Sequence, residues 1–198
     1  MTKPFILGLT GSIGMGKSAV AAMFREAGVP VFDADAAVHE LQGPDGALLG
    51  AIEEEFPGTI GERGVDRQKL GAAVFGDPAA LKRLEALVHP AVGALRQTFM
   101  AEHRSAPLIV LDIPLLYEKG GPHGLDAVVV VSAPAELQRA RVLARPGMSA
   151  EKFAQVLNLQ VPDADKRARA DYVIDTGVAL ADTRRAVQRL VHALTRVQ

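Results

Sequence analysis

The stretch FILGLTGSIGMGKS, from Phe5 to Ser18, decides the fold of this chain. Its first five residues form an apolar run with the length of one buried strand. The fixed positions of the phosphate-binding motif G-x-x-x-x-G-K-[S/T] are then filled by Gly11, Gly16, Lys17 and Ser18. Helix-forming residues follow from Ala19 to Phe24. Strand, loop and helix therefore occur in the order that a P-loop requires, which argues against an ordinary glycine-rich turn.

The chemistry of a phosphate chain explains the composition of this loop. Backbone N–H groups must point inward to bind several negative charges, and glycines leave room for that approach. The helix that begins near Lys17 adds the positive end of its dipole. Lys17 is expected to reach the β- and γ-phosphates of ATP, and the Ser18 hydroxyl to bind Mg²⁺. The predicted ATP-binding residues of this segment are Gly11, Ser12, Ile13, Gly14, Met15, Gly16, Lys17, Ser18 and Ala19.

Composition narrows the class of protein. The chain has 198 residues, 48% of them hydrophobic, and a net charge of −1, so it can form a core but carries no charge excess that favours nucleic acid or a membrane surface. It contains no cysteine, which excludes disulfides and thiolate metal sites and fits a cytoplasmic protein. The first strand begins almost at the start of the sequence, so no signal peptide is expected. We expect a monomer or weak oligomer.

Alternating patterns along the chain predict the rest of the fold. Further strands are expected at residues 29–32, 108–112, 127–131 and 170–175. Helices are expected at residues 36–41, 47–56, 66–75, 78–103, 133–144, 149–160, 163–170 and 180–197, with a flexible loop at 57–64 and a kink or break at Pro90. This order predicts an α/β protein of the P-loop NTPase fold, with a five-stranded parallel sheet flanked by helices.

The expected organisation is one kinase-like domain with two additions. Its core comprises residues 1–35, 104–135 and 170–198. The almost wholly helical stretch 36–103 is long for one crossover, which suggests a helical substrate-binding insertion. Residues 136–169 would form a lid.

Two aspartates, Asp33 and Asp35, follow the second strand. The carboxyl ends of strands are where open α/β sheets build their sites, so one of these carboxylates could accept or orient the proton of a substrate hydroxyl. Capping of the next helix is the alternative role. Both roles can hold at once, one for each aspartate.

Asp112 ends the third strand after four apolar residues. This pattern resembles a Walker B element, whose aspartate would hold Mg²⁺ through water. A polar strand end without a function explains it equally well.

Arg141, in the expected helix 133–144, and Arg145, directly after it, lie one helical turn apart on one face. Arginines positioned there could stabilise the negative charge of a transferring phosphoryl group. Pro146-Gly147 could mark the tip of a mobile lid. A solvated basic helix face is an equally good interpretation from spacing alone.

Several segments together resemble the dephospho-CoA kinase family, in the family's order and over nearly the whole chain. They are residues 9–18, Asp33-Ala34-Asp35, His89-Pro90, Pro114-Leu115-Leu116 with Glu118, Gln138 with Arg141 and Arg145, and residues 170–174. The P-loop is shared by many enzymes, whereas the Asp-Ala-Asp, His-Pro and Pro-Leu-Leu-x-Glu set is far more specific.

The resemblance implies transfer of the ATP γ-phosphate to the ribose 3′-hydroxyl of dephospho-CoA, with Mg²⁺ as cofactor. Asp35 would face this hydroxyl, with Asp33 as its rival, and Lys17, Arg141 and Arg145 would complete the catalytic set. Gly177, with Thr176 before it, would lie near the adenine, and Arg141 would touch ATP phosphates. The implied acceptor-binding residues are Thr10, Asp35, His89, Pro90, Pro114, Leu115, Leu116 and Glu118, with the stretch 36–103 as the CoA-binding region.

The sequence departs from the family pattern at two places. Ser12 stands where many relatives have glycine, and Thr176-Gly177 replaces a more usual Asn-x-Gly. The second departure makes the adenine contact less specific, and neither removes a residue of the phosphate loop.

Three other functions fit the sequence less well. A different small-molecule P-loop kinase is opposed by the Asp-Ala-Asp segment and the helical insertion. A GTP-binding switch usually reads guanine with Asn-Lys-x-Asp, whereas the one asparagine here is Asn158 within Leu-Asn-Leu. An inactive scaffold is opposed by the intact Lys17, Ser18 and Asp35.

Overall fold

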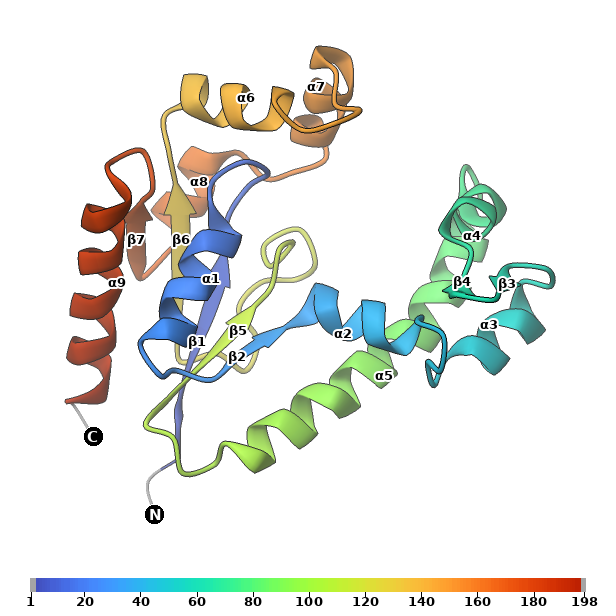
Figure 1. Ribbon diagram of the computed structural model, residues 1–198, viewed down its shortest axis with the longest axis horizontal. Helices are drawn as coiled ribbons and strands as arrows, with labels where there is room; N and C mark the ends of the chain where they lie inside the picture. The colour runs from blue at the N-terminus through green and yellow to red at the C-terminus, as the bar shows by residue number, and fades with distance from the viewer. Residues whose placement is uncertain (1–2, 197–198) are drawn as a thin grey trace. The chain divides into compact units, whose positions relative to one another are not determined.

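The computed structural model describes residues 3–196 and places a five-stranded sheet at the centre of the fold (Figure 1). The strands are β1 (Phe5–Thr10), β2 (Val31–Asp33), β5 (Leu108–Asp112), β6 (Ala127–Ser132) and β7 (Tyr172–Asp175), in the spatial order β2-β5-β1-β6-β7. β1 pairs in parallel with β5 and with β6, and β6 pairs in parallel with β7. The predicted five-stranded parallel sheet is therefore confirmed.

The chain forms two compact units, one of residues 1–32 with 103–198 and the other of residues 33–102. The first unit holds the sheet with helices α1 (Lys17–Glu26), α6 (Ala135–Leu143), α7 (Ala150–Asn158), α8 (Asp163–Ala168) and α9 (Leu180–Thr195). The expected end of the last helix at residue 197 lies outside the described residues.

Alternation along the strands gives the sheet two apolar faces. Val129 and Val131 of β6 join the larger core, which also takes buried side chains of α1 and α9 such as Phe24 and Val187. Val128 and Val130 join a smaller core with Leu116 and Tyr117. Parallel sheets are usually buried on both faces, as this one is. The parallel pairing of β1 with β5 places the carboxyl ends of these two strands next to one another.

The second unit is helical and has its own core. It contains α2 (Ala34–Leu41), α3 (Leu49–Glu55), α4 (Arg67–Val74) and α5 (Pro78–Glu102). Side chains of all four helices form its core, which includes Leu41, Ile52, Leu70 and Ala80. Asp66 and Asp77 accept hydrogen bonds from backbone N–H groups at the starts of α4 and α5, as their positions in the sequence predict.

The expected loop at 57–64 is wrong in part, because residues 60–65 form a small antiparallel hairpin of β3 (Ile60–Gly61) and β4 (Gly64–Val65). Side chains from outside the hairpin hold it. The Glu53 carboxylate accepts hydrogen bonds from the N–H groups of Gly58 and Ile60, and the Thr59 hydroxyl donates to the Phe56 carbonyl. A glycine-rich composition therefore did not make this segment irregular.

Pro90 does not break its helix, contrary to one of the two outcomes expected for it. α5 continues from Pro78 to Glu102 with Pro90 inside it. A proline in a helix costs about 3 kcal/mol or more. Residues on both sides of it, including Leu87, Val88 and Ala91, pack into the core of the second unit and offset that cost.

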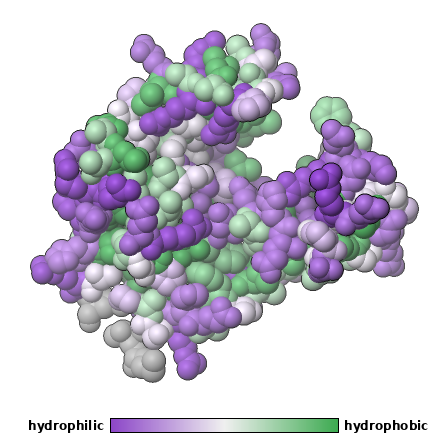
Figure 2. Space-filling model, viewed as in Figure 1, coloured by the Kyte–Doolittle hydropathy of each residue, from purple (hydrophilic) through white to green (hydrophobic). Residues whose placement is uncertain are grey.

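None of the helices in the described part of the chain is both long and apolar enough to cross a membrane. Figure 2 shows predominantly hydrophilic side chains over α3, α4 and the β3–β4 hairpin on the visible face.

Candidate nucleotide-binding and catalytic site

The phosphate loop lies between the end of β1 and the start of α1. Gly14 and Gly16 adopt φ values of 78° and 85°, which side-chain-bearing residues rarely adopt. Gly14 also leaves no space for a side chain, because an added Cβ would lie 2.5 Å from Val142 of α6. The two glycines thus permit a tight loop directly under α6.

Lys17 and Asp112 meet at the carboxyl ends of adjacent strands. The Lys17 Nζ lies 2.5 Å from Asp112 Oδ1, and the Asp112 side chain is only 3% exposed. Asp112 faces Leu9 in the register of β5 with β1. The structure therefore places this carboxylate beside the phosphate loop, in the position of a Walker B aspartate.

The oxygen donors around this lysine suit a magnesium ion bound together with phosphates. Ser18 is exposed in the first turn of α1, and Asp112 supplies a carboxylate. Mg²⁺ is usually held by one or two protein oxygens, substrate phosphates and water, not by a cluster of protein ligands. Residues 3–196 contain no group of three or more His, Asp or Glu side chains arranged to hold a metal.

Thr176 joins helix α6 to the phosphate loop. Its hydroxyl donates to the Met15 carbonyl at 2.7 Å, and Arg141 contacts both the Thr176 hydroxyl, at 3.2 Å, and its carbonyl, at 2.7 Å. The guanidinium of Arg141 is therefore oriented before any nucleotide binds. Arg145 is exposed near the end of α6.

A pocket of about 360 Å³ opens beside Arg141 and Thr176. Its other lining residues are Gly16, Ala19, Val178, Leu180 and Thr183. Val178 and Leu180 are 46% and 59% exposed, so their aliphatic side chains are accessible. Thr176 lines this pocket, whereas Gly177 is not among its lining residues, and the contact of both with an adenine stays a prediction. Sequence reasoning did not name Val178, Leu180 and Thr183, whose only signal was their position just after the fifth strand.

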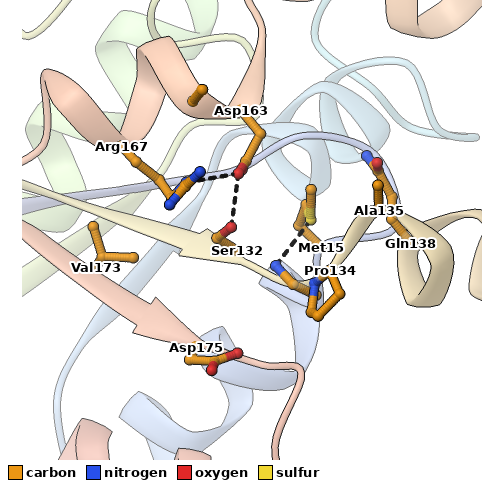
Figure 3. Close-up of a pocket in the computed structure, with 11 residues that line it drawn as sticks. Met15, Ser132, Pro134, Ala135, Gln138, Asp163, Arg167, Val173 and Asp175 are labelled. Atoms are coloured by element: carbon orange, nitrogen blue, oxygen red, sulfur yellow. Dashed lines mark hydrogen bonds and ion pairs between the residues drawn. The ribbon is translucent and has the colours of Figure 1, made fainter.

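A second pocket, of about 530 Å³, lies beyond the ends of β6 and β7 (Figure 3). Asp163 of α8 accepts hydrogen bonds from the Ser132 hydroxyl and from Arg167, at 2.7 and 2.9 Å. Met15 and Gln138 form part of the wall (Figure 3). These contacts tie α8 to β6 next to the phosphate loop.

The segment 114–118 lies against the sheet and is anchored at both ends. The Thr10 hydroxyl donates to the Pro114 carbonyl at 3.2 Å. Leu116 is buried in the core, whereas Leu115 is 36% exposed. Contact of these residues with an acceptor stays a prediction, and Leu115 is the member of the segment that remains accessible to one.

Glu118 forms a buried ion pair that the sequence did not reveal. Its Oε1 lies 2.7 Å from Lys166 Nζ and accepts a hydrogen bond from the Val161 N–H at 2.9 Å. The Lys166 side chain is completely buried. Burial alone would raise the pKa of Glu118, but the hydrogen bonds from Lys166 and Val161 outweigh it and the pKa is lowered.

Replacing Lys166 with methionine should lower the free energy of unfolding by about 3–5 kcal/mol, because it leaves the Glu118 carboxylate buried without its charge partner. Urea unfolding monitored by circular dichroism measures this loss. The double variant Lys166→Met/Glu118→Gln should recover part of it. An unchanged midpoint in the single variant would contradict a stabilising role for the pair.

The same pair should make stability depend on pH. A carboxyl with a lowered folded-state pKa contributes stability above its unfolded value of 4.5, and this contribution disappears as the pH falls through the folded pKa. Glu118→Gln should therefore flatten the loss of stability below about pH 4.5, as thermal melts from pH 3 to 7 would show. An identical slope in both proteins would contradict this assignment.

The remaining predicted residues lie in the second unit. The Asp33 carboxylate caps α2 by accepting a hydrogen bond from the Ala36 N–H at 2.9 Å. Asp35 lies in the first turn of α2 and is exposed. His89 and Pro90 are adjacent residues within α5. The structure thus assigns the capping role to Asp33 and leaves the Asp35 carboxylate accessible.

A family model described as dephospho-CoA kinase matches residues 5–182 of the chain. The chain belongs to the dephospho-CoA kinase family. The match covers the phosphate loop, both aspartates of the Asp-Ala-Asp segment, the lid arginines and Thr176. It confirms the resemblance drawn from the sequence motifs.

Relatives in the dephospho-CoA kinase family match over almost their whole length. The chain is 71% identical to a dephospho-CoA kinase of Novosphingobium aromaticivorans, covering 98% of this chain and 96% of that protein. It is 56% identical to one of Mesorhizobium japonicum, with 96% of each chain covered.

Solved structures agree with this assignment to the dephospho-CoA kinase family. A crystal structure of a Thermus thermophilus protein superimposes with a TM-score of 0.85 at 39% identity, over 98% of this chain and 99% of that one. A dephospho-CoA kinase from Campylobacter jejuni gives a TM-score of 0.65 at 25% identity, over 96% and 97% of the two chains.

Proposed function

We propose that the protein transfers the γ-phosphoryl group of ATP to the ribose 3′-hydroxyl of dephospho-CoA, giving coenzyme A and ADP. This is the final step of coenzyme A synthesis, a phosphotransfer with an alcohol as acceptor. The observation that carries the proposal is an intact phosphate loop, with Lys17 beside Asp112, in a full-length member of this family.

The residues of the first unit suit the ATP half of the reaction. Lys17 leaves Asp112 for the β- and γ-phosphates when the nucleotide binds, and Arg141 faces the same phosphates from α6. Both cations neutralise charge that spreads over the transferring group, which is the main task of a protein in phosphoryl transfer. Magnesium, held by Ser18 and through water by Asp112, would add a further positive charge to the phosphates when bound.

The pocket beside Thr176 suits the adenine of ATP. The aliphatic side chains of Val178 and Leu180 offer apolar contacts to a base, and Gly16, which also lines the pocket, belongs to the phosphate loop. A nucleotide with its phosphates in the loop would therefore have its base in this pocket.

The second unit suits the acceptor. We assign the CoA-binding region to residues 36–103, with His89 and Pro90 shaping it, and the lid to residues 136–169. Asp35 orients the 3′-hydroxyl and accepts its proton, because its carboxylate is exposed whereas that of Asp33 caps a helix. A cytoplasmic monomer or weak oligomer, with no nucleic-acid or membrane partner, fits an enzyme that takes ATP and a small soluble acceptor.

An assay of ADP release from MgATP tests the reaction. We expect release that depends on dephospho-CoA and a product heavier by one phosphoryl group, with the phosphate at the ribose 3′ position by nuclear magnetic resonance. Slow hydrolysis that dephospho-CoA does not change would overturn the proposed acceptor. An acceptor screen with nucleosides and shikimate would then follow.

A further inference from the structure

Ile13 of the phosphate loop is held by two glutamines, one in α6 and one just after α7. The Gln138 side-chain amide of α6 donates to the Ile13 carbonyl at 2.7 Å. The Gln160 side-chain carbonyl, beyond the end of α7, accepts from the Ile13 N–H at 3.0 Å. Neither glutamine makes a second contact of this kind to another loop residue among the hydrogen bonds of the described chain.

The two glutamines are themselves well fixed. Gln138 is only 5% exposed, and α6 lies so close to the loop that its Gln138 carbonyl would be 3.0 Å from a Cβ added at Gly14. Gln160 precedes Val161, whose N–H binds the carboxylate of the Glu118–Lys166 ion pair. Partly buried hydrogen bonds between groups fixed in this way resist displacement more than fully exposed ones.

The next part of the loop is held in a similar way. The Met15 carbonyl accepts from Thr176, and the Met15 sulfur accepts from the Ala133 N–H at 3.1 Å. Figure 3 shows Met15 and Gln138 at the wall of the pocket beyond β6. Groups from α6, β6 and the segment after β7 therefore hold the side of the loop that does not bind phosphate.

In this arrangement, some backbone groups of the loop bind protein side chains and others remain available to a ligand. The N–H and carbonyl of Ile13 are taken by the glutamines, so they are not available to a phosphate. The N–H groups of Lys17 and Ser18 precede the first hydrogen bonds of α1, which Ala19 and Val20 donate to the Gly16 carbonyl, so these two groups can face a ligand. Loop residues can bind phosphate strongly only if the peptide before them keeps its orientation, because reorienting a loop costs conformational entropy.

We propose that Gln138 and Gln160 are positioning residues that preset the phosphate loop for ATP through the two polar groups of Ile13. They do not touch the nucleotide. The affinity of the loop for the phosphates then depends on the two hydrogen bonds that join Ile13 to Gln138 and to Gln160. The inference rests on the proposed kinase function only for the choice of acceptor in the kinetic assay.

Methionine substitutions test the proposal, since methionine keeps the length of glutamine but has no hydrogen-bond donor and, in its sulfur, only a weak acceptor. Gln138→Met and Gln160→Met should each raise the Kd for MgATP, measured by calorimetry without acceptor, about 5–10-fold. The KM for ATP should rise by a similar factor, whereas the KM for dephospho-CoA should stay within about twofold. The double variant should show less than the product of both effects, because both glutamines hold one peptide.

Two further variants separate positioning from simple support of the fold. Gln160→Glu retains an oxygen that accepts from the Ile13 N–H and should restore most of the affinity, whereas Gln138→Glu has no donor when ionised and should not. Gln155→Met, at an exposed position of α7, is the matched control and should change nothing.

Equal Kd values for MgATP in all variants would overturn the proposal. A fall in melting temperature with proportionate changes in both KM values would also overturn it, because it would indicate a structural role alone. If the wild-type chain bound MgATP but did not phosphorylate dephospho-CoA, the proposed acceptor would fail while the calorimetric comparison still decided the role of the glutamines.

Discussion

Replacing Lys17 with methionine should lower kcat for ADP release by about 10²–10³-fold, because one preorganised donor at a site of developing charge contributes about that much. The ammonium group is the cation nearest to the expected γ-phosphate, and its flexible stem allows it to move from Asp112 to the nucleotide. Steady-state kinetics with saturating dephospho-CoA measure the loss. Lys3→Met, an exposed substitution outside the phosphate loop and before β1, should leave kcat unchanged.

Replacing Lys17 should also change the stability of the protein, because Lys17 forms an ion pair with Asp112. Asp112 is almost fully buried, so losing Lys17 removes an ion pair from a buried carboxylate and should lower the free energy of unfolding. Lys17→Met/Asp112→Asn should regain much of that stability without regaining turnover. Recovery of turnover in the double variant, or near-normal turnover in a folded Lys17→Met protein, would contradict the catalytic role of Lys17.

The phosphate loop and the sheet could be predicted from the sequence because their signals are local. Residues 5–18 contain a strand, a loop and a helix start within one stretch, and the apolar runs at 108–112 and 127–131 are strands in the structure. The order of these elements along the chain was sufficient to predict a parallel sheet, since helical segments separate most of the strands.

The hydrogen bonds that hold the phosphate loop could not be predicted in the same way, because they join residues that lie far apart in the chain. Gln160 is 147 positions from Ile13, and Thr176 is 161 positions from Met15. Nothing near Lys166 in the sequence indicates that it is buried, since lysine is almost never fully buried unless paired. Its partner, Glu118, was predicted as an acceptor-binding residue on resemblance alone, and that role stays a prediction.

The hairpin at 60–65 and the unbroken α5 show that local sequence signals can also fail to predict secondary structure. Glycine and proline predicted irregular backbone at both places. Glu53 and Thr59 supply the hydrogen bonds that order the hairpin. Packing around Pro90 keeps α5 continuous. In both cases contacts outside the local sequence pattern outweighed an intrinsic preference.

Asp35→Asn should lower kcat by about 10²–10³-fold, because asparagine can accept a hydrogen bond from the 3′-hydroxyl but cannot take its proton. The exposed carboxylate in the first turn of α2 is the accessible member of the Asp-Ala-Asp segment. The Kd for MgATP should remain within about twofold, since the residues proposed to bind ATP all belong to the first unit. Single-turnover measurements with saturating substrates would isolate this effect from product release.

Asp33→Asn is the matched control, because asparagine caps helices as well as aspartate does. Its side-chain oxygen can still accept from the Ala36 N–H, so stability and kcat should change little, whereas Asp33→Ala should cost about 1 kcal/mol of stability. A large loss of kcat in Asp33→Asn with near-normal turnover in Asp35→Asn would reverse the two roles. Near-normal turnover in both would mean that positioning and charge neutralisation suffice, as a loose phosphoryl-transfer transition state allows.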